Sequence, residues 1–345
     1  METKSVSTRF AKISKSDPCY IIAEIGSNHN GSYDQASEMI GKAAEAGVNA
    51  VKFQTFKAKN HYSKNTPGIS LYKEDIYKLI ERLEIDRSWH GKLAKECEER
   101  NIDFLDSPCD SEAIGIAISV GMPILKVASF DMVDVRLINE ISKTGKAIMF
   151  SAGMCTLSEI ETAVNICRQN RNDNIIVLQC TSIYPAPTNL SNLAAMSTIE
   201  KAFGVIPGYS DHTLGDHIAC AAVAMGAKVI EKHYTLDRNM QGPDHKFAID
   251  PGELKEMVNK IRDIEEAIGD GIKNGPRAEE MEFYKNARRS ILAGRDILAG
   301  EVISDTDIVI KRPGYGIPPS MIDLVAGRVA KINIEADTPI TWEMI

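Results

Sequence analysis

The sequence lacks the features that would place it at a membrane or on nucleic acid. No apolar run approaches the roughly 18 residues that span a bilayer, and the first residues, Met1 to Val6, form no hydrophobic signal-peptide stretch. The net charge is −8 without any basic block, since pairs such as Lys311-Arg312 stand alone. We therefore expect a cytoplasmic protein that acts on a small molecule, with no membrane or nucleic acid as partner.

The seven cysteines lack the pattern of a disulfide framework or a cysteine-rich metal site. Their number is odd, they are scattered, and Cys-x-x-Cys never occurs. Several, such as Cys180, lie in apolar runs, so we expect reduced core thiols. Cys109 differs because it follows Asp-Ser-Pro at a predicted strand end, but neither His212 nor His233 is an obvious base for it, which disfavours a catalytic thiol.

What the chain does contain is one repeated unit: a short apolar strand, a polar strand end and an amphipathic helix. About eight such units occur, the number that closes a parallel barrel. The predicted strands are 20–24, 50–56, 103–107, 124–129, 147–151, 175–181, 205–210 and 228–234, and the clearest helices are 34–46, 111–120, 134–143, 157–169, 215–225 and 251–268. An open doubly wound sheet is the alternative, although no Gly-x-Gly-x-x-Gly follows the first strand to support its dinucleotide-binding form.

A domain boundary is predicted near residue 270. At 345 residues and 43% hydrophobic, the chain can form a barrel and a small second domain. Glycines and Pro276 punctuate a charged stretch, after which short β-type segments are predicted at 290–293, 302–303, 308–311 and 329–332. We predict a barrel domain over 1–269, a linker over 270–289 and a compact strand-rich domain over 290–345. Residues 57–88 interrupt the pattern with a polar insertion, which fits either a lid over the barrel mouth or a plain surface loop.

Two histidines stand at the carboxyl ends of successive predicted strands. His212 lies in Gly-Tyr-Ser-Asp-His-Thr and His233 in Val-Ile-Glu-Lys-His-Tyr. Neighbouring strands of a parallel barrel present their last residues to one cavity, so the two imidazoles are predicted to form a divalent-metal site. Two unrelated strand-end residues that hydrogen-bond to loops are the alternative. Asp211 before one histidine and Glu231-Lys232 before the other favour the site.

Two lysines lie inside apolar strands, where an unused charge would be costly. Lys52 occurs in Ala-Val-Lys-Phe-Gln and Lys126 in Ile-Leu-Lys-Val-Ala. Taken singly, each could be a solvated surface group. Other polar residues expected at the same end of the barrel are Glu24, Gln54, Ser129, Ser151, Tyr184 and Ser210. Ammonium groups beside hydroxyls predict a pocket for a phosphate together with a carboxylate.

Several longer phrases resemble one family closely. They include Ile-Ala-Glu-Ile-Gly-Ser-Asn-His-Asn-Gly (22–31), Val-Lys-Phe-Gln-Thr (51–55), Leu-Lys-Val-Ala-Ser (125–129), Cys-Thr-Ser-Ile-Tyr-Pro-Ala-Pro (180–187), Gly-Tyr-Ser-Asp-His-Thr (208–213), Ile-Glu-Lys-His-Tyr-Thr-Leu-Asp (230–237), Gly-Pro-Asp-His-Lys (242–246) and Lys-Arg-Pro-Gly (311–314). From about residue 18 to the C-terminus, the chain resembles the N-acetylneuraminate (sialic acid) synthase family, including its legionaminate and pseudaminate synthases.

The resemblance implies an α/β fold, a TIM (β/α)8 barrel followed by a small antifreeze-like (SAF) β-rich domain that swaps over the partner's active site in a homodimer. It implies a transferase that condenses phosphoenolpyruvate with water and an open-chain 2-acetamido hexose, first of all N-acetylmannosamine, to give N-acetylneuraminate and phosphate. A legionaminate or pseudaminate synthase that uses a 6-deoxy-2,4-diacetamido hexose is the alternative. The implied metal is Mn²⁺ or Mg²⁺.

The same resemblance assigns roles to individual residues. His212 and His233 match the metal ligands, and His233 is also counted with the catalytic residues. Lys52, Lys126, Ser129, Ser151 and Ser210 match the positions that hold phosphoenolpyruvate. Glu24, Gln54, Tyr184 and Asp244 match the positions that contact the sugar or handle protons, with Glu24 the expected acid–base residue. Arg312 matches the arginine that the partner's small domain offers to the N-acyl group.

Three departures from the family pattern concern the substrate walls. Many relatives have Ser-Gly-Glu where this chain has Ser129-Phe130-Asp131, so Asp131 is expected at the substrate with a shorter side chain. Ser182 stands where some relatives have asparagine, and Cys109 ends a stretch that reads Ser-Thr-Pro-Phe elsewhere. These differences leave the acceptor sugar open.

Two other classes of protein remain as alternatives. A Schiff-base aldolase would use a strand-borne lysine such as Lys126 to form an imine with pyruvate, but the histidine pair would then have no role. A noncatalytic sugar-binding or coat protein would fit the ice-binding likeness of the small domain, but it would not need two strand-embedded lysines beside paired histidines.

Overall fold

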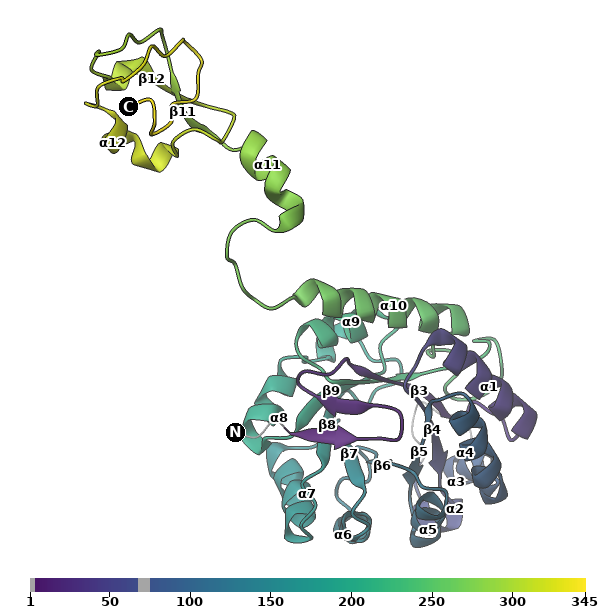
Figure 1. Cartoon of the computed structure of the whole chain (residues 1–345). Helices are drawn as coiled ribbons and strands as arrows, with labels where there is room; N and C mark the ends of the chain where they lie inside the picture. Colours follow the sequence, from purple (N-terminus) through teal and green to yellow (C-terminus); the bar gives the residue numbers. More distant parts are fainter. Residues whose placement is uncertain (1–3, 68–74) are drawn as a thin grey trace. The chain divides into compact units, whose positions relative to one another are not determined.

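The computed structural model describes residues 4–67 and 75–345. The chain divides into two compact units, Met1–Gly269 and Asp270–Ile345, which are described separately below. In Figure 1 the first unit runs from purple to green and the second from green to yellow.

The first unit is a closed barrel of eight parallel strands in the order β10-β3-β4-β5-β6-β7-β8-β9. The predicted TIM-barrel fold is confirmed. Almost every strand residue is buried, because the strands face the packed barrel interior on one side and the helices on the other. The strands are β3 (Tyr20–Gly26), β4 (Ala50–Thr55), β5 (Asp103–Pro108), β6 (Ile124–Val127), β7 (Ala147–Ser151), β8 (Ile175–Cys180), β9 (Ile206–Asp211) and β10 (Val229–His233).

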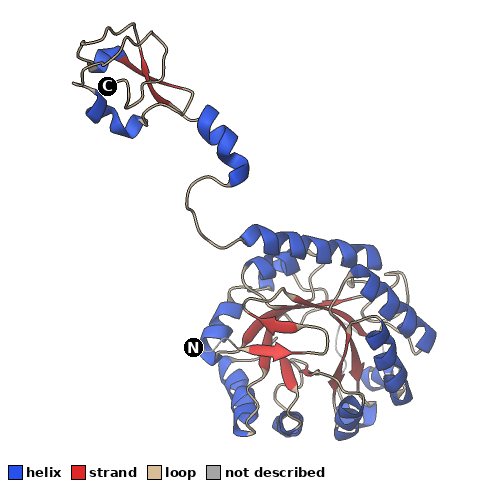
Figure 2. Ribbon diagram, viewed as in Figure 1, coloured by secondary structure: helices blue, strands red, loops and turns tan. Residues whose placement is uncertain are grey.

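Helices surround the barrel on the outside, as Figure 2 shows. They are α1 (Tyr33–Ala46), α4 (His90–Glu99), α5 (Ser111–Ser119), α6 (Val135–Lys143), α7 (Leu157–Gln169), α8 (Ala195–Phe203), α9 (His217–Ala224) and α10 (Pro251–Ile268). The sequence prediction missed α8, which buries only Met196 and Ile199 and therefore has a weak apolar stripe. Gly47 ends α1 in the left-handed conformation that glycine adopts without strain.

A short antiparallel hairpin precedes the barrel, formed by β1 (Ser5–Ser7) and β2 (Lys12–Ser14). Val6 and Ile13 pack in one apolar cluster with Tyr20, Ile22 and other residues from the first halves of the strands. The hairpin therefore closes the amino end of the barrel, which leaves the carboxyl end for chemistry.

The segment 57–88, predicted as a polar insertion, contains two short helices. α2 (Ala58–His61) and α3 (Ile76–Leu83) lie in it, while residues 68–74 lie outside the described part of the chain. Leu79 and Leu83 pack against Phe56 at the end of β4. This packing anchors the segment beside the carboxyl end of the barrel.

The second unit has its own small core. β11 (Ser290–Ala293) pairs antiparallel with β12 (Ile308–Lys311), at two of the predicted β segments. The predicted segments at 302–303 and 329–332 form only the isolated bridge between Val302 and Val329. The predicted linker 270–289 is partly helical, because it contains α11 (Met281–Asn286). A last short helix is α12 (Ile322–Val325). Within the described residues of both units, no helix is long and apolar enough to cross a membrane.

Candidate active site at the carboxyl end of the barrel

Four charged side chains from four strands meet inside the barrel mouth. Lys52 Nζ on β4 lies 2.7 Å from Glu24 Oε2 on β3. The Glu231 carboxylate on β10 lies between two lysines, 3.9 Å from Lys52 Nζ and 4.0 Å from Lys126 Nζ on β6. Each of the four residues is at most 5% exposed. The alternative that both lysines are solvated surface groups is therefore excluded, and their burial is offset by opposite charges.

Burial is the main influence on the protonation of these groups. It raises the pKa of Glu24 to about 7 against the opposing effect of Lys52. It also lowers the pKa of Lys126. Burial acts in the same direction on Lys52, but Glu231 and Glu24 outweigh it and raise the pKa of that ammonium. At Glu231 burial favours the protonated acid, yet Lys126 and Lys52 outweigh it and lower the pKa. Glu24 can therefore exchange a proton near neutral pH.

Hydroxyl groups accompany both ammonium groups. Lys126 Nζ donates to Ser151 Oγ at 2.7 Å, and Lys52 Nζ donates to Ser107 Oγ at 3.1 Å. Ser151 is the last residue of β7, and Ser107 lies one residue before the end of β5. Each lysine is therefore paired with a serine from the neighbouring strand. Ammonium and hydroxyl donors side by side are suited to bind the oxygens of a phosphate or carboxylate.

Two further contacts involve residues named from the sequence. Gln54 Nε2 donates to Glu24 Oε1 at 2.6 Å. Ser129 and Ser182 hydroxyls lie 2.9 Å apart, next to Gly153. A Cβ at position 153 would collide with both serines, and the positive φ of +40° there also favours glycine. The glycine thus keeps the two hydroxyls close together.

The two histidines converge, as predicted. The ring centroids of His212 and His233 are 5.5 Å apart, and the Tyr184 ring lies 4.3 Å from the first and 6.0 Å from the second. Burial lowers the pKa of both imidazoles, so both are neutral at physiological pH. The expectation that neighbouring strand ends bring the two rings together is met by the geometry.

The donor set of these imidazoles is suited to a metal ion. His212 Nδ1 lies 2.7 Å from the Thr181 carbonyl oxygen, which only accepts, so Nδ1 carries the proton and Nε2 has a free lone pair. Within the described residues, the buried Nδ1 atom of His233 has no hydrogen-bond partner. Asp244 Oδ2 lies 3.8 Å from it, and burial raises the pKa of Asp244 to about 6. A neutral imidazole nitrogen with an open lone pair is what a divalent metal ion requires of a histidine ligand, and the remaining positions of Mn²⁺ or Mg²⁺ would be filled by oxygen ligands.

Asp131 and Arg312 are placed differently from the other predicted residues. Asp131 Oδ1 lies 3.6 Å from His61 Nε2, and burial raises the pKa of this carboxyl. Arg312 follows β12 in the second unit, is exposed, and donates through Nε to the Ala287 carbonyl. The expected contact of Arg312 with a barrel site of a partner chain stays a prediction.

Glu231 is a site residue that sequence reasoning missed, since it was treated with Asp211 and Lys232 only as flanking charge. Ser210 Oγ donates to Glu231 Oε1 at 3.0 Å, whereas Lys232 Nζ lies 2.8 Å from Asp211 Oδ2. Side chains alternate along a strand, so Glu231 shares a face with His233 and Lys232 takes the other. The two-residue spacing between Glu231 and His233 was the sequence signal that could have identified Glu231 as a site residue.

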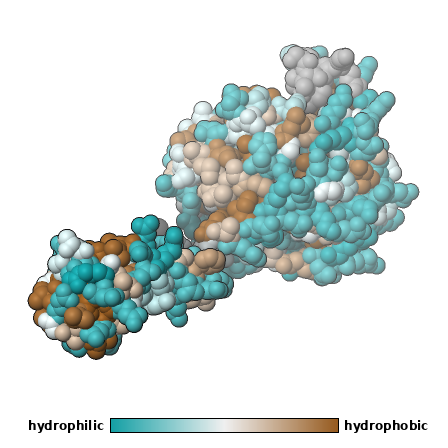
Figure 3. All heavy atoms as spheres, turned by 90° about the horizontal axis from the view of Figure 1, so that it is seen from above, coloured by the Kyte–Doolittle hydropathy of each residue, from teal (hydrophilic) through white to brown (hydrophobic). Residues whose placement is uncertain are grey.

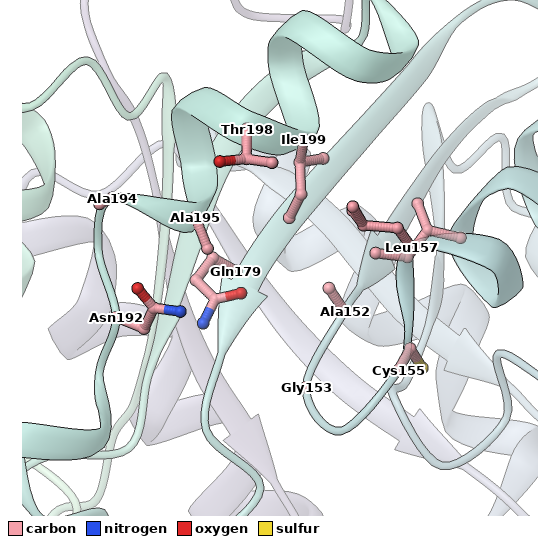
Figure 4. A pocket seen from close by; sticks show the side chains of 11 residues that line it. Ala152, Gly153, Cys155, Leu157, Gln179, Asn192, Ala194, Ala195, Thr198 and Ile199 are labelled. Atoms are coloured by element: carbon pink, nitrogen blue, oxygen red, sulfur yellow. The ribbon is translucent and has the colours of Figure 1, made fainter.

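A cavity of about 360 Å³ lies beside α7 and α8 (Figure 4). It is lined by Ala152, Gly153, Cys155, Leu157, Ile160, Gln179, Asn192, Ala194, Ala195, Thr198 and Ile199. None of these is a predicted site residue, and no ionisable carboxylate or ammonium lines the cavity. The charged cluster at the barrel mouth, which lies beside the histidine pair, therefore remains the better candidate for binding an anionic substrate.

Comparison with known proteins agrees with this geometry. Residues 39–273 match the NeuB family, and residues 288–345 match the SAF domain. This chain belongs to the NeuB family. Its resemblance to sialic-acid-type synthases and its second-domain type are thereby confirmed.

Individual relatives cover nearly the whole chain. An N,N'-diacetyllegionaminic acid synthase of Campylobacter jejuni is 41% identical over 92% of this chain and 97% of its own length. A synthase of the same name from Legionella pneumophila is 37% identical over 95% of this chain and 94% of its own. The crystal structure of N-acetylneuraminic acid synthetase from Leptospira borgpetersenii superimposes with a TM-score of 0.74 at 35% identity, covering 81% of this chain and 95% of that one.

Proposed function

We propose that this NeuB-family chain joins phosphoenolpyruvate to the aldehyde of an open-chain N-acyl hexosamine. The enol carbon forms a bond to the aldehyde carbon, water supplies the oxygen of the new 2-keto group, and phosphate leaves. The observation that carries the proposal is the convergence of Lys52 and Lys126 with Glu24 and Glu231 in a buried mouth that also holds two neutral imidazoles.

The anionic substrate fits the lysine side of the mouth. Lys126 with Ser151 and Lys52 with Ser107 offer pairs of donors on adjacent strands. Phosphate and carboxylate oxygens would replace these internal hydrogen bonds and neutralise the ammonium charge. Ser210 holds the Glu231 carboxylate, whose negative charge favours the protonated form of both lysines.

The histidine side fits a divalent metal held by His212 and His233. When bound, Mn²⁺ or Mg²⁺ would supply Lewis acidity toward the sugar aldehyde. Thr181 fixes the orientation of the His212 ring. Tyr184 packs against the rings of both histidines, and Phe247 packs against the ring of His233. Glu24, with its pKa raised to about 7 by burial, would accept or donate the proton that the condensation moves.

The acceptor we propose first is a 6-deoxy-2,4-diacetamido hexose, the alternative that the sequence left open. The support is that two relatives at 41% and 37% identity are named N,N'-diacetyllegionaminic acid synthases. N-acetylmannosamine, the acceptor expected first from the sequence, is the second candidate. An acceptor with a single acetamido group is supported by the mouse N-acetylneuraminate-9-phosphate synthase, which is 33% identical to this chain.

We also propose a homodimer in which the second unit of one chain covers the barrel mouth of the other, with Arg312 at the N-acyl group. The second unit carries exposed apolar side chains that a partner could cover, and brown patches are visible on it in Figure 3. Those more than 45% exposed are Ile272, Phe283, Leu298, Val302, Tyr315, Leu324, Val329 and Ile332. Such a concentration on a small domain is typical of an interaction surface.

The deciding assay measures phosphate release from phosphoenolpyruvate with a 6-deoxy-2,4-diacetamido hexose and, in parallel, with N-acetylmannosamine. Each reaction is run with chelator and again after Mn²⁺ is added back. We expect release only with sugar and metal together, and faster with the diacetamido sugar. Phosphate release that ignores the sugar or survives chelation would refute the proposal.

A Schiff-base aldolase is tested in the same preparation, because the lowered pKa of Lys126 is also a property of imine-forming lysines. Pyruvate would then form an imine with this lysine, with loss of water, and hydride from borohydride would reduce that imine to a stable secondary amine. We expect no such adduct by intact-protein mass spectrometry.

A further inference from the structure

A second group of metal-binding side chains lies at the carboxyl end of the barrel. One ligand atom each from His61, Cys109 and Asp131 lies within 4.8 Å of the others. Among the described residues, this is the one group of three or more histidine, cysteine, aspartate or glutamate side chains at such spacing. None of the three belongs to the pair formed by His212 and His233.

Three separate elements bring these residues together. His61 is the last residue of α2, and its ring stacks on Phe56 at an interplanar angle of 17°. Cys109 follows β5 directly and packs against the apolar cluster that contains Phe56. Asp131 lies in the turn after β6, where its amide donates to the Ala128 carbonyl. The group therefore rests on two strand ends and one helix end, with each residue partly buried.

We propose that His61, Cys109 and Asp131 bind a zinc ion, with the fourth position open to water. A thiolate, an imidazole and a carboxylate are the three ligand types that zinc accepts together, whereas Mg²⁺ and Mn²⁺ prefer oxygen-rich sites. Zinc bonds of about 2.3 Å to sulfur and about 2.0 Å to nitrogen place tetrahedral ligand atoms roughly 3.5 Å apart. His61 Nε2 and Asp131 Oδ1 already lie at 3.6 Å.

The proposal predicts a consequence for turnover that rests on the proposed function. Asp131 is expected at the sugar substrate, so a zinc ion that occupies its carboxylate competes with the acceptor. Zinc would then raise the apparent KM for the sugar, and the Cys109→Ser variant would be less sensitive. The binding measurement below needs no turnover, so its failure is distinct from a failure of the proposed function.

The test titrates the full-length chain with Co²⁺, which reports thiolate ligation through a charge-transfer band in the near ultraviolet. We expect the band in the wild type, its loss on addition of Zn²⁺, and its absence in Cys109→Ser. Cys155→Ser is the matched control, because Cys155 is also partly buried and its thiol donates only weakly to the Ser129 carbonyl. The control should keep the band.

Two more variants separate the sites and guard against a folding defect. His61→Gln should weaken zinc affinity at least about tenfold, because loss of a mere second-sphere partner already weakens metal binding by roughly that factor. His212→Ala should leave the thiolate band unchanged. Circular dichroism checks that each variant is folded. A wild type without the band, or a folded Cys109→Ser variant that retains it, overturns the proposal.

Discussion

His212 Nδ1 lies 2.7 Å from the carbonyl oxygen of Thr181, an interaction between the ends of β9 and β8. Because a carbonyl oxygen accepts and never donates, the contact assigns the proton of this imidazole to Nδ1. The ring is thereby held in one orientation with the lone pair on Nε2 free. This one contact preorganises the His212 ring, which suits the metal-binding role that we propose for the histidine pair.

Replacing either histidine should abolish metal retention and activity together. We expect His212→Ala and His233→Ala to lose bound Mn²⁺ after dialysis, measured by elemental analysis, and to release no phosphate from phosphoenolpyruvate. His217→Ala is the control, because His217 is exposed at the start of α9. A metal-free variant with full activity would contradict the assignment.

Removing the ionisable group at position 24 should change how stability depends on pH. The folded pKa of Glu24 is about 7, above the ordinary value of 4.5. A raised acid pKa contributes stability that is complete below the unfolded pKa and is lost as pH rises through the folded one. Denaturant unfolding of the wild type should therefore show this loss between about pH 4.5 and pH 7, and Glu24→Gln should lack it.

Glu161→Gln serves as the control for this pH experiment. Glu161 is exposed on α7, so its replacement should leave the pH profile of stability unchanged. Equal profiles for the wild type and Glu24→Gln would show that Glu24 does not titrate as its buried setting requires.

The serine beside Lys126 should matter for the anionic substrate. Lys126 Nζ donates to Ser151 Oγ, and both side chains are buried. A hydrogen bond to a charged group contributes about 1.5–3 kcal/mol, so Ser151→Ala should raise the apparent KM for phosphoenolpyruvate about ten- to hundredfold. Steady-state kinetics at saturating sugar measures this. The exposed Ser158 offers a neutral comparison, and a KM unaffected by Ser151→Ala would place the phosphate elsewhere.

The swapped dimer predicts complementation between two inactive or weakened variants. Arg312→Ala should mainly raise the apparent KM for the sugar, whereas the exposed neighbour Arg289→Ala should not. Mixing Arg312→Ala with a His233→Ala chain should restore part of the turnover, because one intact composite site forms. Absence of rescue, with subunit exchange verified by native mass spectrometry, would indicate a site built within a single chain.

Gly153 should be far more sensitive to a methyl group than another glycine with positive φ. Gly153→Ala would place its Cβ against Ser129 and Ser182, whereas Gly145, with φ of 73°, has no atom within 4 Å of an added Cβ. Backbone strain at either site costs about 1 kcal/mol, and overpacking at Gly153 adds about 1–3 kcal/mol. Denaturant midpoints compare the two variants. Equal losses of stability in the two variants would mean that Ser129 and Ser182 move apart at no cost to accommodate the added methyl group.

Local patterns in the sequence were sufficient for the barrel strands, because each is a short apolar run that ends in a polar residue. They failed at α8, whose two buried residues give little periodicity, and at the β1–β2 hairpin, whose three-residue strands carry almost no pattern. They also gave no indication of the short helices at residues 58–61 and 76–83, within the predicted polar insertion. Short elements are stabilised by tertiary contacts, which a local pattern does not contain.

The sequence by itself determined the eight-fold alternation, the family and most of the residue types at the barrel mouth, because strand polarity and alternation are local properties. Only the tertiary structure decided which charges meet. It paired Lys232 with Asp211 on one strand face and placed Glu231 between Lys52 and Lys126 on the other. It also brought Cys109 to His61 and Asp131. These distances depend on barrel closure and register, which join residues from strands far apart in the chain.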